Sequence, residues 1–141
     1  MPVMVSTHPR TRVRLEALAR KDLEGITFHE PFGYLDYNKL QLEAKCVISD
    51  SGTISEEASI SNFCAISLRD SIERPEALEV GSMILTGVDP AILLQAIEIE
   101  TTLKRTAVIP EGYGTLEFSN RVLKFLISTA GKHKTWKGLS S

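Results

Sequence analysis

Residues 49–58 combine the residue types from which proteins build phosphate-binding sites. They read Ser-Asp-Ser-Gly-Thr-Ile-Ser-Glu-Glu-Ala and follow an apolar run at residues 46–48. A helix that opens on Ser51, Gly52 and Thr53 presents unpaired backbone N–H groups and the positive end of its dipole to an anion. Hydroxyl groups on both sides of the glycine add hydrogen-bond donors. These three residues, called the 51–53 turn below, therefore predict a phosphate site.

Glu57 extends this predicted site beyond a phosphate. It follows Ser51 by six residues, which is under about two turns of a helix. Its carboxylate is therefore placed to accept hydrogen bonds from a vicinal diol while phosphates lie at the helix start. Together these features describe a nucleoside diphosphate with its ribose. The alternative is an ordinary strand-to-helix turn in which Ser and Thr act as caps, because one glycine is a weak signal.

A second charged segment follows the next apolar run, at residues 69–76. It holds Arg69, Glu73, Arg74 and Glu76. A guanidinium from this segment is suited to a diphosphate already seated on a helix N-terminus. The alternative is an internal ion-pair network that fixes the loop itself.

Aromatic side chains and a histidine accompany the two charged segments. Phe32, Tyr34 and Tyr37 offer a flat apolar wall for a nucleobase, although packing in the core is the usual role of such aromatics. His8 stands directly before a proline, after the first apolar run. A histidine in this position either caps a loop or contributes to the site, and the sequence leaves both roles open.

Composition places the chain among ordinary globular proteins. It has 141 residues, of which 43% are hydrophobic and 24% charged, with a formal net charge of −2. That balance predicts one soluble domain and gives no electrostatic reason to expect nucleic acid. Cys46 and Cys64 lack CxxC spacing, which favours reduced, buried thiols and a cytoplasmic protein over a disulfide or metal site. No apolar run approaches the length of a membrane span.

Short apolar runs alternate with helical segments along the chain. The expected strands are residues 3–5, 26–28, 46–48, 65–68 and 83–85. The expected helices are about 10–21, 36–44, a short one to 61, one towards 80, one from the Asp89-Pro90 cap to 102, and 116–130. Short strands that are continuously apolar and separated by helices indicate an α/β protein with a doubly wound, Rossmann-like parallel sheet.

Three details of these elements can be checked against the structure. Asp36 is the expected N-cap of its helix. Two apolar stripes are expected to be inner faces, on the first and last helices: Val13, Leu15, Leu18 and Ala19, then Val122, Leu123, Leu126 and Ile127. Because ligands of doubly wound sheets bind at the carboxyl ends of strands, His8, residues 32–37, residues 51–57 and the charged segment are expected to converge.

The two charged motifs, residues 49–58 and 69–76, together resemble the non-hydrolysing UDP-N-acetylglucosamine 2-epimerases. The resemblance runs from about Val3 to Thr102 and includes residues 8–11, 33–37 and 81–87. It implies the carboxyl-terminal half of a two-domain, glycosyltransferase-B-type fold that binds UDP and needs neither metal nor cofactor.

The resemblance also implies roles for individual residues. Ser51, Gly52 and Thr53 would hold the diphosphate and Glu57 the ribose hydroxyls. Arg74 would reach the nucleotide side of the cleft, and Phe32 and Tyr37 would flank the uracil. Arg69, Glu73 and His8 are further candidates. His8 falls where several bacterial relatives carry a histidine that contacts a second, effector sugar nucleotide, but the Pro-Arg-Thr that follows it differs from those relatives.

Several features depart from the usual family pattern. Thr53 stands where the family has a second glycine, a replacement that a subgroup acting on modified acetamido sugars would tolerate. Asn62 and Cys64 stand where Gly and Pro are common in the family. The family's acidic catalysts and its active-site histidine precede the segment matched here. We therefore expect a fragment or truncated gene product whose catalytic residues lie outside this chain.

The resulting functional expectation is the UDP-binding portion of a sugar-nucleotide 2-epimerase. The whole enzyme would invert C2 of a UDP-2-acetamido sugar, of the UDP-GlcNAc/UDP-ManNAc type, by eliminating and re-adding UDP, for surface polysaccharide synthesis. One alternative is a UDP-sugar-binding fragment without turnover. Another is the nucleotide-binding half of a glycosyltransferase, which the Glu73–Glu76 motif disfavours.

The expected domain covers residues 1–131, is incomplete at its N-terminus, and is followed by a basic tail at 132–141. Residues 116–131 would form the returning C-terminal helix. In the family topology a strand lies between those at 3–5 and 46–48, so both would carry unpaired backbone ladders here. We therefore expect a homo-oligomer that associates through the open edge or the last helix.

Overall fold

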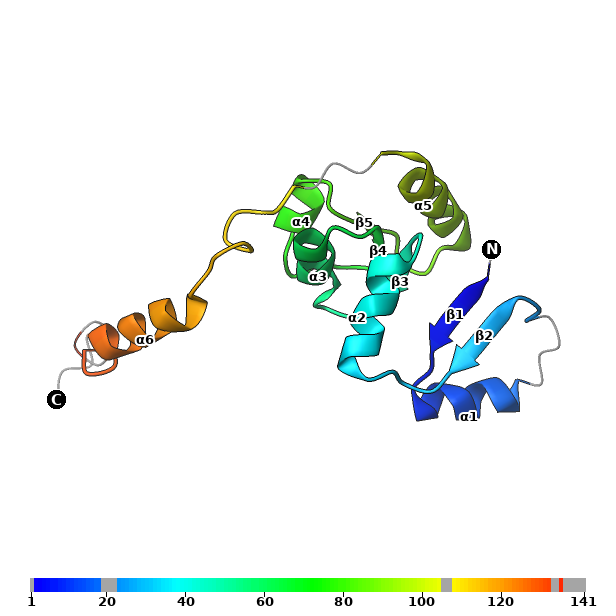
Figure 1. Cartoon of the computed structure of the whole chain (residues 1–141), viewed down its shortest axis with the longest axis horizontal. Helices are drawn as coiled ribbons and strands as arrows, with labels where there is room; N and C mark the ends of the chain where they lie inside the picture. Colours follow the sequence, from blue (N-terminus) through cyan, green and yellow to red (C-terminus); the bar gives the residue numbers. More distant parts are fainter. Residues whose placement is uncertain (1, 19–22, 105–107, 133–134, 136–141) are drawn as a thin grey trace.

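The computed structural model describes residues 2–18, 23–104, 108–132 and 135, and confirms the expected α/β fold (Figure 1). Strands and helices alternate from β1 to α5, and a final helix, α6, follows. The strands are β1 (Val3–Ser6), β2 (Ile26–His29), β3 (Val47–Ser49), β4 (Ala65–Ser67) and β5 (Ile84–Leu85). The helices are α1 (Pro9–Ala17), α2 (Tyr34–Glu43), α3 (Ile54–Ser61), α4 (Glu76–Glu79), α5 (Pro90–Thr102) and α6 (Phe118–Thr129).

The strands form two parallel sheets rather than one. β1 pairs with β2, with Val3 opposite Ile26, and β3, β4 and β5 form a second sheet in that order. The described strands of the two sheets are not hydrogen-bonded to each other, so the single doubly wound sheet that the sequence predicts is divided into two here. Among the described strands, β1 and β3 thus each have a single hydrogen-bonded neighbour, as the sequence led us to expect.

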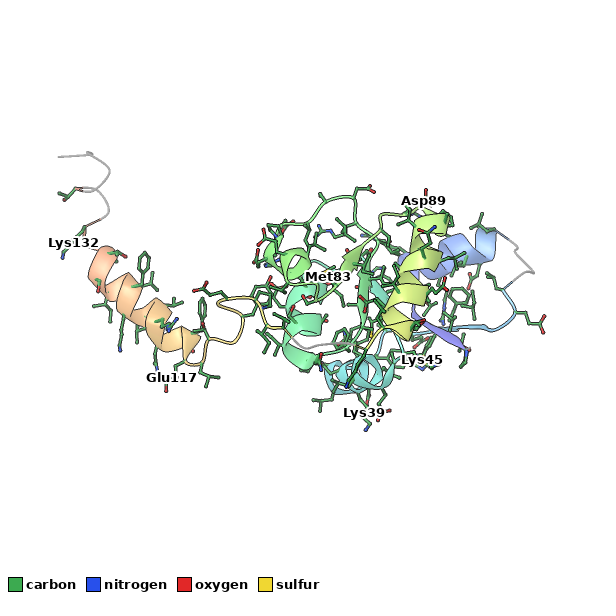
Figure 2. The ribbon with its side chains drawn as sticks, turned by 90° about the horizontal axis from the view of Figure 1, so that it is seen from above. Lys39, Lys45, Met83, Asp89, Glu117 and Lys132 are labelled. Atoms are coloured by element: carbon green, nitrogen blue, oxygen red, sulfur yellow. The ribbon has the colours of Figure 1, made fainter. Side chains whose placement is uncertain are left out.

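Burial follows this division. All three residues of β4 are buried, whereas Met4 on β1 is 54% exposed and Ile48 on β3 is 42% exposed. The core lies around α3, β4 and α4, and Figure 2 shows Met83 within this part of the molecule. Its members are Ile54, Ala58, Phe63, Ala65, Ala77 and Met83. Before Ile54, no hydrophobic side chain among the described residues is buried.

The inner face predicted for the first helix is wrong for two of its members. Val13 is 66% exposed and Leu18 is also exposed, while Leu15 is half-buried. Ala19 lies outside the described residues. α1 packs beside a two-stranded sheet, which is too small to cover a full apolar stripe.

Helix capping was predicted correctly at α5 and wrongly at α2. Asp89 caps α5 as expected, because its Oδ1 accepts hydrogen bonds from the backbone N–H groups of Ala91 at 2.8 Å and Ile92 at 3.2 Å. At α2 the N-cap is Gly33, not Asp36, since the extended backbone of Gly33 lets the helix begin at Tyr34. The carboxylate of Asp36 then lies in the first turn, where negative charge still favours the helix dipole.

The last helix stands away from the rest of the described chain. α6 begins at Phe118, two residues later than expected, after Glu117 in the left-handed conformation. Both views show it separated from the sheets, with Glu117 at its start (Figures 1 and 2). The apolar stripe predicted as its inner face is wrong, because all four of its side chains are exposed: Val122, Leu123, Leu126 and Ile127.

Cys46 and Cys64 are half-buried thiols rather than fully buried ones. Asn62 ends α3 in the left-handed conformation, which explains why glycine is common at this position and why asparagine is accepted there. Of the expected basic tail, 132–141, only Lys132 and Thr135 are described. No helix in the described part of the chain is long and apolar enough to cross a membrane.

Candidate functional site

The 51–53 turn connects β3 to α3 and is shaped by its own hydroxyls. Ser49 Oγ accepts a hydrogen bond from Ser51 N at 3.0 Å, and Ser51 Oγ accepts one from Thr53 N at 3.3 Å. α3 begins at Ile54 with Thr53 as N-cap. The N–H groups of the first helical turn have no intrahelical acceptors, so the positive end of α3 opens at this turn. A helix start of this kind is suited to an anion, and it lies where the sequence predicts a phosphate site.

Glu57 lies one turn along α3 and its carboxylate is held from two sides. Thr53 Oγ1 donates a hydrogen bond to Glu57 Oε1 at 2.6 Å, and Gln41 Nε2 donates one to Glu57 Oε2 at 2.7 Å. The Thr53 hydroxyl therefore serves Glu57 in this structure rather than standing free for a phosphate. Two of the carboxylate's roughly four acceptor positions remain for other donors.

Tyr37 brings α2 to the same place. Burial is the largest cause that raises the pKa of Tyr37, and the negative charges of Glu57 and Asp50 raise it further. The phenol therefore stays protonated well beyond neutral pH. It combines an aromatic face with a hydroxyl donor beside the Glu57 carboxylate.

Arg74 braces the turn from the segment after β4. Its Nε lies 2.6 Å from Glu56 Oε1, and its Nη1 donates to the Gly52 carbonyl at 3.3 Å. The alternative of an internal ion-pair network thus describes Arg74 in this structure. The contact to a backbone carbonyl ties its guanidinium directly to the predicted anion site.

Arg69 lies close to the backbone of the turn. A Cβ added at Gly52 would lie 3.2 Å from Arg69 Nη1, so a side chain there would require the guanidinium to shift slightly. Arg69 Nη2 is 3.6 Å from Glu73 Oε1, a loose and largely exposed pair. Arg69 is therefore the less constrained of the two guanidinium groups beside the 51–53 turn.

The structure brings most of the predicted residues together, but not all. Five of the predicted residues lie in the turn or near it: Tyr37, Thr53, Glu57, Arg69 and Arg74. Glu73 is linked to the turn only through its pair with Arg69. His8 instead caps α1, with its Nδ1 accepting a hydrogen bond from Arg10 N at 3.2 Å. Phe32 stacks on His29 at the end of β2, with ring centroids 4.1 Å apart and planes 8° from parallel. Neither His8 nor Phe32 has a hydrogen bond or ion pair to the 51–53 turn.

Sequence reasoning missed three residues of this site. Gln41 was detectable, because it follows Tyr37 by four residues and so shares its helical face. Glu56 is the partner of Arg74, a contact that the sequence analysis did not predict. Tyr113 donates to Glu76 Oε1 at 3.1 Å from a distant loop, and no local pattern indicates that contact.

The assembled site can bind an anion and a diol, with an aromatic ring beside them. Its positive groups are backbone N–H groups and two guanidiniums, and its acceptor is the Glu57 carboxylate. In the described part of the chain, no group of three or more His, Cys, Asp or Glu side chains is arranged to hold a metal ion. The positive groups and the Glu57 carboxylate fit the recognition of a nucleoside diphosphate through its phosphates and ribose.

A family model and individual relatives both match this chain, and their descriptions agree. The family model described as UDP-N-acetylglucosamine 2-epimerase matches residues 1–127. The UDP-N-acetylglucosamine 2-epimerase of Methanocaldococcus jannaschii is 38% identical over 135 residues, which cover 93% of this chain and 36% of that protein. A UDP-2,3-diacetamido-2,3-dideoxy-D-glucuronate 2-epimerase of Pseudomonas aeruginosa is 31% identical over 127 residues, covering 89% of this chain and 34% of that protein.

Solved structures agree with these sequence relatives. The Rickettsia bellii UDP-N-acetylglucosamine 2-epimerase superposes with a TM-score of 0.86 at 38% identity, covering 95% of this chain and 38% of that one. The Methanocaldococcus jannaschii enzyme in complex with UDP-GlcNAc and UDP gives a TM-score of 0.78 at 36% identity, covering 90% and 36%. The chain thus spans about a third of the length of the relatives that it matches.

We predict that Arg74 stabilises the protein in the absence of any ligand. Replacing Arg74 by Met removes the contacts to Glu56 and Gly52 and should lower the free energy of unfolding by about 1 kcal/mol. The matched change Arg69→Met removes only the loose pair with Glu73 and should cost under about 0.5 kcal/mol. Urea denaturation of both variants measures the difference, and equal losses would show that Arg74 is not a brace.

Proposed function

Because the chain belongs to the UDP-N-acetylglucosamine 2-epimerase family, we propose that it binds the UDP part of a UDP-2-acetamido sugar. The observation that carries this proposal is the open positive end of α3 at the 51–53 turn, with the Glu57 carboxylate fixed one turn further along the same helix. That spacing suits a diphosphate and the ribose attached to it.

The proposed contacts follow from the chemistry of each group. The backbone of Ser51, Gly52 and Thr53 holds the diphosphate, and Arg69 and Arg74 add positive charge beside it. Glu57 accepts hydrogen bonds from the ribose diol. The rings of Phe32 and Tyr37 supply apolar faces for the uracil.

Two candidates have less support from the geometry. Glu73 acts on the site only through Arg69. His8 is engaged in capping α1, so a contact with an effector sugar nucleotide would have to use its other ring nitrogen. We assign neither of them a direct contact with UDP.

The proposed reaction of the whole protein is inversion at C2 of the acetamido sugar through elimination and re-addition of UDP, in the synthesis of polysaccharide precursors. The site described here would stabilise the diphosphate as it leaves and hold it for return. We place the protein in the cytoplasm, where Cys46 and Cys64 would remain reduced.

Two other functions use the same site. A UDP-sugar-binding fragment without turnover needs the 51–53 turn and Glu57 but no catalytic acid or base. A nucleotide-binding half of a glycosyltransferase is less well supported, because the family match extends through the 69–76 segment.

We predict that UDP binds more tightly than uridine by about tenfold or more, because each charge-assisted hydrogen bond to a phosphate contributes about 1.5–3 kcal/mol. Glu57→Ala should weaken UDP by about tenfold and leave inorganic pyrophosphate unaffected. Glu98→Ala, a change at an exposed position of α5, is the matched control. Titration calorimetry measures these affinities for the wild type and both variants, and equal binding of UDP and uridine would contradict a diphosphate site.

We predict that this chain alone does not epimerise UDP-acetamido sugars, since it spans about a third of the length of its epimerase relatives and the family resemblance implies catalytic residues outside it. Activity should appear when the amino-terminal half of a relative is supplied in trans, if the two halves can associate. Exchange of C2 configuration, followed by NMR, measures both cases. Turnover by the isolated chain would overturn this expectation.

We propose that the protein self-associates through the open edges of β1 and β3 or through the apolar stripe of α6. The unpaired N–H and C=O groups of an open strand edge can pair with a strand of another chain, and an exposed apolar stripe marks a contact surface. Light scattering should give a mass above that of one chain, and Leu126→Lys in α6 should reduce it if the stripe is the contact. A monodisperse monomer at high concentration with a cooperative melt would contradict the proposal.

A further inference from the structure

Gln41 is a buried amide in a part of the chain that buries little else. Only 3% of Gln41 is exposed, and of the described residues before Ile54 only Thr7 is buried to the same degree. Its neighbour Leu42 is 58% exposed on the same helix. α2 therefore turns an amide inward and a leucine outward, which is the reverse of what packing alone would select.

The buried amide has one specific partner. Gln41 Nε2 donates to Glu57 Oε2 at 2.7 Å across the contact between α2 and α3. The other oxygen of the same carboxylate accepts the Thr53 hydroxyl at 2.6 Å. Each oxygen thus has one donor from the protein, and the two donors come from different elements, so the carboxylate cannot rotate without losing one of them.

A carboxylate held in this way has a fixed pair of remaining acceptor positions, one on each oxygen. A vicinal diol offers two donors at a fixed spacing and is best bound by acceptors that are already oriented. The two hydrogen bonds from Gln41 and Thr53, called the clamp below, orient Glu57 before any ligand binds. Tyr37, one turn before Gln41 on α2, lies beside the same carboxylate and keeps its phenol protonated.

We propose that Gln41 is a positioning residue that, together with Thr53, orients the Glu57 carboxylate for the ribose diol of the nucleotide. This inference rests on the proposed function, in which Glu57 accepts hydrogen bonds from that diol. It also gives Thr53 a defined role, because the hydroxyl of this side chain supplies the second donor of the clamp. A glycine at position 53 would leave Glu57 Oε1 without that donor.

The test compares UDP with 2′,3′-dideoxy-UDP, which lacks the diol, by titration calorimetry on the full chain. The wild-type protein should prefer UDP by about tenfold, the value expected for two ordinary hydrogen bonds. Gln41→Met keeps the length of the side chain but removes the donor, and should reduce this preference to about threefold or less. The affinities for 2′,3′-dideoxy-UDP and for inorganic pyrophosphate should not change.

Two further variants separate positioning from a general effect on the fold. Thr53→Val removes the other donor at an exposed position outside the core and should lower the same preference. It keeps the test valid if Gln41→Met does not fold. Gln95→Met, a matched change at an exposed position of α5, should leave the preference at the wild-type value.

The outcomes are distinct. A fall in the preference for UDP over its dideoxy analogue, with pyrophosphate binding unchanged, supports the proposal. An unchanged preference in both Gln41→Met and Thr53→Val overturns it while leaving the diol contact of Glu57 intact. Equal weakening of all three ligands shows a structural role only and also overturns it. A wild-type protein that does not distinguish UDP from the dideoxy analogue removes the ribose contact itself, and the positioning role with it.

Discussion

The burial of β4 is the constraint on which the rest of the described structure depends. β4 is hydrogen-bonded to β3 on one edge and β5 on the other, and all three of its residues are buried. The core side chains of α3, among them Ile54 and Ala58, pack in the cluster beside it. This packing fixes the position of α3, and with it the 51–53 turn. The phosphate part of the site is therefore built on the best-packed portion of the chain.

Two adjacent carboxylates on α3 link this packed helix to the neighbouring elements of the candidate site. Glu56 and Glu57 follow each other on α3, and each is held by a side chain from a different element. Arg74, in the segment after β4, binds Glu56, and Gln41, on α2, binds Glu57. These two contacts join three separate elements around one turn. Because successive helical residues point about 100° apart, the pair can reach in two directions while sharing one backbone.

Local signals in the sequence were sufficient for the elements and the turn. Continuous apolar runs identify the strands, and Asp89 before Pro90 identifies the start of α5. The glycine between two hydroxyl residues identifies the turn at which the anion site is proposed. The N-cap of α2 was predicted at Asp36 but lies at Gly33. A helix can begin wherever the backbone conformation permits it, and Gly33 permits it without a hydrogen bond from a capping side chain. The exposure of Val13 was missed since an apolar stripe does not reveal how much surface is available to cover it.

The long-range contacts were outside the reach of sequence reasoning for a different reason. Gln41 and Glu57 are 16 residues apart, and Arg74 and Gly52 are 22 apart. Periodicity shows that Gln41 shares a helical face with Tyr37, but not which carboxylate that face meets. The sequence indicated which chemical groups were available, and tertiary packing decided how they pair.

The two halves of the proposed nucleotide site rest on supports of unequal strength. The 51–53 turn and Glu57 are joined to the buried core by α3, which contributes Ile54 and Ala58 to it. Phe32 instead follows β2, which belongs to a two-stranded sheet with no buried hydrophobic side chain among its described residues. An isolated two-stranded sheet is marginally stable in water. α2 connects the two halves. It begins two residues after Phe32, and its buried side chain Gln41 is hydrogen-bonded to Glu57 on α3. The hydrogen bond between Gln41 and Glu57 therefore does more than orient a carboxylate: it fixes the less stable half of the site to the more stable one.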